Sequence, residues 1–264
     1  MDIKREVKAI EQEVIELRRD FHRHPELGFE EFRTAGIIRD YLGALDLDDV
    51  LTCSGTGTIG ILHGGKPGKT VMMRADIDAL PIQEESGEPF SSETPGVAHA
   101  CGHDGHTAML LGEAKIWAAH REEIPGTLVF LFQPNEEDAG AQIMIDDGAL
   151  VMAGNPEAVF GCHLKHNFPF GTIAMVPGPM MASSYYFKVT IRGKGGHGGY
   201  PHLCISPIST ASHVIASIDT FNSLEQNVFR PTVISIGKIH AGEKEIVIPD
   251  TLELEGSIRC LHFD

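Results

Sequence analysis

Residues 126–138 have the sequence GTLVFLFQPNEED, an apolar run that ends in three consecutive acids. Its β-branched and aromatic residues predict a buried strand, because a strand covered on both faces has few polar positions. Polar residues that follow such a strand stand where open α/β sheets place their binding sites. Two interpretations of Glu136 and Glu137 stay open. They complement the dipole of a following helix, or one carboxylate binds a metal while the other takes a proton.

Two further apolar segments also end in polar residues. Residues 71–74 predict a strand that leads to Asp76 and Asp78, and residues 158–163 predict one that ends in His163. The remaining expected elements of this part are a strand over 58–62 and helices over 1–24, 28–43 and 106–120. Strands that alternate with helices predict an α/β fold with a mostly parallel sheet. We expect a functional role for Asp76, which lies nearer the strand end, whereas a loop salt bridge is an equal alternative for Asp78.

Residues 99–106, HACGHDGH, gather three histidines, a cysteine and an aspartate within eight positions. Cys101 and His103 are two residues apart, so in an extended segment or tight turn both side chains can face one centre. Thiolate and imidazole suit zinc and its first-row neighbours. The alternative is a buried cysteine with histidines at a helix start. We expect Cys101 and His103 to be metal ligands and His99, Asp104 and His106 to support them or to begin the helix.

The character of the chain changes after Pro177-Gly178-Pro179. Strands are expected over 184–192, 232–240 and 251–260, and a helix over 205–223, which predicts a smaller α+β domain. A short strand is also expected over 171–176, and a glycine-rich turn over 193–199 carries His197. The expected domains are residues 1–179 and residues 180–264.

The composition excludes several classes of protein. The net charge of −16 argues against nucleic acid or an anionic membrane as the main partner. No apolar run is long enough to cross a membrane and no signal core is present, so the expected location is the cytoplasm. Five widely spaced cysteines imply no disulfide framework. Residues 64–70, GGKPGKT, fail as a phosphate-binding loop because a strand is expected after them where that loop needs a helix.

Six segments, in order, resemble motifs of the M20 metallopeptidase and amidohydrolase family. They are FHRHPE (21–26), RADIDALP (74–81), HACGHDGH (99–106), QPNEE (133–137), GGH (195–197) and IPD (248–250). The resemblance is to the N-acyl-amino-acid amidohydrolase branch, which includes hippurate hydrolases, auxin-conjugate hydrolases and N-acetyl-diaminopimelate deacetylases. It implies a metallohydrolase domain followed by a lid and dimerisation domain.

The resemblance also implies roles for individual residues. The residues that match ligands of two divalent ions (manganese, zinc, cobalt or nickel) are Cys101, His103, Glu137 and His163. Glu136 matches the general base that activates the metal-bound water, and Asp76 matches a supporting acid. His197 matches a lid histidine that binds substrate. The implied partners are a small N-acyl amino acid and a second copy of the chain, joined through the lid domain.

Two functional hypotheses follow. The first is a metal-dependent amidohydrolase that cleaves the amide bond of N-acyl amino acids. The family continues past the position that matches Asp264, with a segment that supplies one more histidine ligand, so we expect this sequence to be C-terminally truncated. The second hypothesis is therefore a catalytically defective relative that retains the fold and part of the metal binding.

Overall fold

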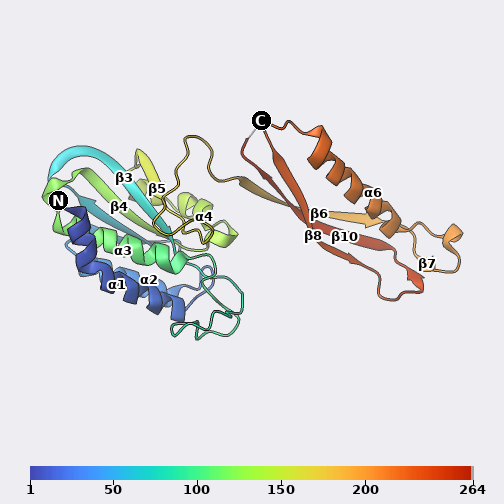
Figure 1. Cartoon of the computed structure of the whole chain (residues 1–264), viewed down its shortest axis with the longest axis horizontal. Coiled ribbons are helices and arrows are strands. Elements are labelled where there is room, and N and C mark those ends of the chain that lie inside the picture. Colours follow the sequence, from blue (N-terminus) through green and yellow to red (C-terminus); the bar gives the residue numbers. More distant parts are fainter. Residues whose placement is uncertain (263–264) are drawn as a thin grey trace. The chain divides into compact units, whose positions relative to one another are not determined.

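The chain forms two compact units, Met1–Pro169 and Phe170–Asp264 (Figure 1). The computed structural model describes residues 1–262. The division falls after Pro169, ahead of the Pro177–Pro179 segment where the composition changes. Each unit has its own sheet and its own apolar core.

A five-stranded sheet in the order β1-β2-β4-β3-β5 forms the centre of the first unit. Its strands are β1 (Asp49–Cys53), β2 (Gly57–His63), β3 (Lys66–Asp76), β4 (Pro125–Gln133) and β5 (Ala158–Gly161). β3 pairs in parallel with both β4 and β5, whereas β2 pairs antiparallel with β1 and β4. Among the described strands of this sheet, β2 alone runs against the others, so the predicted mostly parallel sheet is confirmed.

Helices cover both faces of this sheet (Figure 1). On one face lie α1 (Ile3–Arg23), α2 (Phe32–Gly43) and α3 (His103–Ala119), which pack with Phe130 and Phe132 of β4. The alternate residues, Val129 and Leu131, belong to the core of the other face, with residues of α4 (Gly140–Asp146) and α5 (Ala149–Met152). Successive side chains of a strand point to opposite faces, which explains why the apolar run Leu128–Phe132 of β4 contributes to two cores.

α3 begins three residues earlier than the sequence predicted, at His103 instead of His106. The residue before it, Gly102, has φ +88°, a left-handed conformation that glycine adopts without a steric penalty. This sharp turn places His103 in the first turn of the helix.

The second unit has a three-stranded antiparallel sheet in the order β6-β10-β8. Its described elements are β6 (Ser183–Arg192), β7 (Gly196–His197), α6 (Pro207–Thr220), β8 (Thr232–Ala241), β9 (Val247–Ile248) and β10 (Thr251–Cys260). Ala211 of α6 packs with Leu252 and Leu254 of β10. This α+β arrangement confirms the predicted class of the smaller domain. The expected strand over 171–176 is wrong, because these residues form no strand.

Short helical turns complete the chain: Arg121–Glu123, Glu136–Asp138, Pro201–Leu203 and the π-helical turn Phe221–Glu225. Across residues 1–262, no helix combines the length and the apolar character that a membrane span requires.

Replacing Phe132 by alanine should lower the free energy of unfolding of the first unit by about 3–5 kcal/mol, because the fully buried ring leaves a cavity. Urea unfolding followed by fluorescence of Trp117, the single tryptophan, reports on this unit since Trp117 packs against the same core. Phe32→Ala is the matched control, because Phe32 is 68% exposed. Equal losses for the two variants would contradict the assignment of Phe132 to the core.

Candidate metal centre

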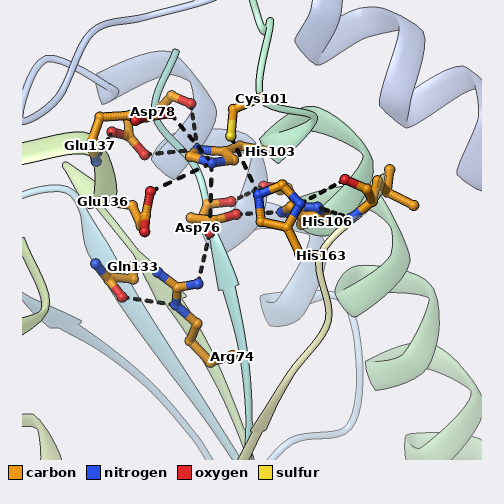
Figure 2. Close-up of polar contacts among 12 residues, drawn as sticks. Arg74, Asp76, Asp78, Cys101, His103, His106, Gln133, Glu136, Glu137 and His163 are labelled. Carbon is orange, nitrogen blue, oxygen red and sulfur yellow. Dashed lines mark hydrogen bonds and ion pairs between the residues drawn. The ribbon is translucent and has the colours of Figure 1, made fainter. Parts of the chain in front are cut away.

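The polar residues that follow β3, β4 and β5 meet at one edge of the sheet (Figure 2). The three strands are parallel, so their carboxyl ends lie at the same edge. The residues brought together there are Asp76, Asp78, Cys101, His103, His106, Glu136, Glu137 and His163. All six residues that the sequence placed at this rim, namely Asp76, Cys101, His103, Glu136, Glu137 and His163, are among them.

His103 lies at the centre of the cluster and is 1% exposed. Its Nδ1 donates to Asp78 and lies 3.0 Å from both the Oδ1 and the backbone oxygen of that residue. Its Nε2 is buried without a hydrogen-bond partner, 3.7 Å from Asp76 Oδ2, 3.8 Å from Glu136 Oε2 and 3.9 Å from Glu137 Oε1. A carboxylate behind one ring nitrogen and a free second nitrogen is the usual setting of a metal-binding histidine.

Burial lowers the pKa of His103, but the hydrogen bond to Asp78 and the charges of Asp76, Asp78 and Glu136 outweigh it and raise the pKa overall. These acids create a negative potential around Nε2. The same potential favours a bound cation.

Cys101 and His163 approach each other on the other side of His103. Sγ of Cys101 lies 3.3 Å from Nε2 of His163, whose Nδ1 donates to the backbone oxygen of Leu164 at 2.7 Å. Burial lowers the pKa of His163, which favours the neutral ring that binds metals. Burial, and then Glu137, raise the pKa of the Cys101 thiol to about 12. Without a cation, this cysteine is therefore a neutral thiol.

Three sets of ligand atoms have all their members within 4.8 Å of one another: Cys101 with His103 and His163, Asp76 with His103 and His106, and His103 with Glu136 and Glu137. His103 belongs to all three. Sulfur, imidazole nitrogen and carboxylate oxygen together suit zinc and other first-row divalent ions. The orphaned Nε2 of His103 and this donor set fit a divalent metal.

Glu136 and Glu137 lie in the turn Glu136–Asp138, which we call the acid turn. The backbone nitrogen of Glu137 donates to Oδ2 of Asp78 at 3.1 Å. Burial, and then the charge of Asp76, raise the pKa of Glu136, against an opposite effect of Arg74. The side chain of Glu136 keeps 39% exposure, so this acid can reach solvent or a substrate.

Asp76 is buried and ionised. It accepts hydrogen bonds from Nδ1 of His106 at 2.6 Å and from Arg74 at 2.7 Å. Burial raises its pKa, but the bond from His106 and the charge of Arg74 prevail and lower it to about 2. Nε2 of the same His106 ring accepts from the backbone nitrogen of Leu164 at 2.9 Å. The ring therefore connects Asp76, at the end of β3, to the segment after β5.

The structure also shows the contacts of Asp78, whose role the sequence left open, and of Asp104 and His99, which were expected to support the metal ligands. Asp78 makes no loop salt bridge with lysine or arginine among the described residues and instead orients His103 and Glu137. Asp104 accepts from Nδ1 of His22 at 2.7 Å. His99 is buried and belongs to none of the three ligand sets. Of the two alternatives left open for Asp78, these contacts favour a place in the site over a loop salt bridge, as its position two residues beyond Asp76 indicated.

His197 belongs to the second unit, at the end of β7. Its Nδ1 accepts from the backbone nitrogen of Gly199 at 3.0 Å, and its ring lies 5.3 Å from that of Tyr200.

Known proteins similar to this chain include carboxypeptidases and amidohydrolases. It is 41% identical over 263 residues to thermostable carboxypeptidase 2 of Saccharolobus solfataricus, covering 98% of the chain and 66% of that protein. It is 42% identical over 260 residues to the N-acyl-L-amino acid amidohydrolase of Geobacillus stearothermophilus, covering 98% of the chain and 70% of that protein. The chain thus spans about two thirds of the length of these curated relatives.

Solved structures and a family model agree with these relatives. The YXEP protein of Bacillus subtilis, described as a dinuclear metal-binding peptidase of the M20 family, matches with a TM-score of 0.79 and 39% identity. The match covers 97% of this chain and 65% of that one. Residues 72–250 match the model of peptidase family M20/M25/M40. The chain therefore belongs to peptidase family M20/M25/M40.

Proposed function

We propose that this chain carries the reaction centre of a metal-dependent amidohydrolase that cleaves the amide bond of N-acyl amino acids. The observation that carries the proposal is the position of Glu136, a partly exposed carboxylate 3.8 Å from the orphaned Nε2 of His103. The substrate class is supported by relatives named N-acetylcysteine deacetylase, N-acyl-L-amino acid amidohydrolase and IAA-amino acid hydrolase. Their common substrate element is an amide between an acyl group and an amino acid.

In this proposal Cys101, His103, Glu137 and His163 hold two divalent ions, with manganese, zinc, cobalt and nickel all compatible with the donors. When bound, these ions supply Lewis acidity, which lowers the pKa of water and polarises a carbonyl. Asp78 orients His103 through Nδ1 and Glu137 through its backbone nitrogen.

Glu136 is the general base. It takes a proton from the attacking water as the new carbon–oxygen bond forms, and it delivers that proton to the nitrogen as the amide bond breaks. A carboxyl whose pKa is raised by burial is suited to both steps, since it holds the proton longer than an exposed acid. Asp76, kept ionised by Arg74 and His106, supports the negative potential of the centre.

The second unit supplies the lid and the dimer contact in this proposal, and His197 contacts the substrate. β8 pairs with β10 on one edge only, within the part of the chain that the structure describes. Val233 and Ile239 of β8 are 57% and 52% exposed. An edge strand with exposed apolar side chains can pair with a second copy of the same strand. The proposed location of the enzyme is the cytoplasm.

Glu136→Gln should lower kcat for N-acetyl amino acids or hippurate by about 10²–10⁴-fold, because the amide cannot take the proton from water. Bound metal, measured by elemental analysis, should stay at the wild-type level, since Glu137 and not Glu136 is the proposed ligand. Amino-acid release by wild type and variant is the assay. Unchanged turnover would remove Glu136 from its role, and metal binding by a wild-type chain that hydrolyses none of these amides would favour a catalytically defective relative.

Zinc affinity should rise with pH, because the thiol of Cys101, with its pKa raised to about 12, must lose a proton to bind as a thiolate. Calorimetry in buffers of different ionisation enthalpy counts the protons released on binding. Cys101→Ser should release about one proton fewer than wild type. Cys260→Ser in the second unit is the control and should match wild type. Equal proton release by wild type and Cys101→Ser would exclude the thiolate as a ligand.

Sedimentation analysis of the wild-type chain at micromolar concentration should show a dimer. Ile239→Lys should shift it toward monomer, because a charge on the edge of β8 opposes pairing of strands. Val7→Lys, at a 50% exposed position of α1, serves as the matched control. A monomeric wild type, or a dimer that both variants leave intact, would contradict the proposed contact.

A further inference from the structure

Glu31 is a buried carboxylate that the proposed reaction does not use. It precedes α2 and is 0% exposed. Its Oε1 accepts from the backbone nitrogen of Asn135 at 2.9 Å, and its Oε2 accepts from the hydroxyl of Thr56 at 2.6 Å. Burying an acid is unfavourable unless its hydrogen bonds return a comparable gain. The bonds from Asn135 and Thr56 therefore connect this buried acid to two segments outside α2.

Asn135 is the residue that leads into the acid turn. It follows Pro134, which has no backbone N–H, and it has φ +50°, a left-handed conformation that asparagine tolerates better than most residues. Ala139, at the other end of the turn, also has a positive φ of +67°. A turn bracketed by two such residues persists only where its surroundings fix it. The bond from Asn135 to Glu31 is one such fixed point.

The second fixed point is the bond from the backbone nitrogen of Glu137 to Asp78. Glu31 thus holds the backbone amide of Asn135, just before the acid turn, and Asp78 holds that of Glu137 within it, one on each side of Glu136. Asp78 is also connected to the segment between α1 and α2, which carries Glu31. The backbone nitrogen of the next residue, Ala79, donates to the backbone oxygen of Glu26 in that segment at 2.8 Å. Among the described residues, Glu31 and Asp78 are the two carboxylates that accept from backbone amides of this segment.

The packing of Gly28 against Asn135 shows how closely the segment between α1 and α2 fits the acid turn. A Cβ atom on Gly28 would lie 1.8 Å from Oδ1 of Asn135, so a side chain at position 28 would displace the Asn135 side chain. The carboxamide of Asn135 donates to the backbone oxygen of Asp138 at 3.2 Å, which closes the turn on itself. A displacement at Asn135 is therefore transmitted to the acids that follow it.

We propose that Glu31 is a positioning residue that sets the direction of the Glu136 and Glu137 side chains by anchoring the acid turn at Asn135. The inference rests on the proposed function for the role of Glu136, and on the geometry alone for the position of Glu137. Small misplacements of reacting groups cost far more in rate than in binding of substrate. Glu31 acts through the turn and touches neither substrate nor metal.

The test compares Glu31→Gln with Thr56→Val in the full chain. Glu31→Gln keeps the shape of the side chain but leaves it one carbonyl oxygen for two donors. Thr56→Val removes the other hydrogen bond of the same carboxylate, so it controls for the loss of a buried polar contact. Glu31→Asp, which keeps the charge but shortens the reach, is the second variant and carries the comparison if Glu31→Gln does not fold, as judged by the fluorescence of Trp117.

The kinetics of amide hydrolysis and the affinity for zinc are the two measurements that test the role of Glu31. Glu31→Gln and Glu31→Asp should lower kcat by about tenfold or more with KM close to wild type, and should weaken zinc binding by about tenfold because Glu137 shares the turn. Thr56→Val should stay within about twofold of wild type in both. If the Glu31 variants and Thr56→Val change kcat and zinc affinity equally, the positioning role is overturned and the proposed function stands. If wild type hydrolyses no amide while zinc binding still separates the variants, the proposed function fails and the positioning role stands.

Discussion

The hydrogen bonds of Asp78 determine the geometry on which the whole centre depends. One oxygen of this carboxylate holds Nδ1 of His103, and the other holds the backbone nitrogen of Glu137. His103 belongs to each of the three sets of ligand atoms, and Glu137 to one of them. A single buried acid therefore joins the first turn of α3 to the turn after β4. Since Nδ1 donates to Asp78, the ring presents Nε2 to the acids and to Cys101.

Parallel pairing of β3 with β4 and β5 brings these residues to one edge. The register pairs Asp76 with Gln133, so both strands end at the same level and the acids that follow β4 lie beside Asp76 (Figure 2). Cys101 and His103 come from a different connection and reach the edge because the left-handed Gly102 starts α3 there. Mutual repulsion among these acids is costly. Arg74 and His106 offset part of it at Asp76, and a divalent cation would offset more when bound.

The parallel strands and their shared polar edge could be predicted from residues 126–138, 71–78 and 158–163. An apolar run that ends in polar residues indicates both a buried strand and the end of that strand where a site lies. The six residues expected at the rim do meet there. The hydrogen-bond partners of Asp78 and Glu31 could not be predicted, since each carboxylate accepts from a backbone amide of a segment distant in sequence. The expected strand over 171–176 failed because apolar composition without a neighbouring strand leaves the backbone unpaired. β1, at the sheet edge, has too short and mixed a pattern to be predicted from sequence.

The central claim is that Cys101, His103, Glu137 and His163 hold a pair of divalent ions beside Glu136. X-ray absorption spectroscopy of the zinc-loaded chain tests it most directly, because it identifies the ligand atoms without a substrate. We expect a zinc–sulfur shell at about 2.3 Å together with nitrogen and oxygen neighbours, and a metal–metal distance of about 3.5–4 Å. A shell of oxygen atoms alone, with neither sulfur nor a second metal, would contradict it.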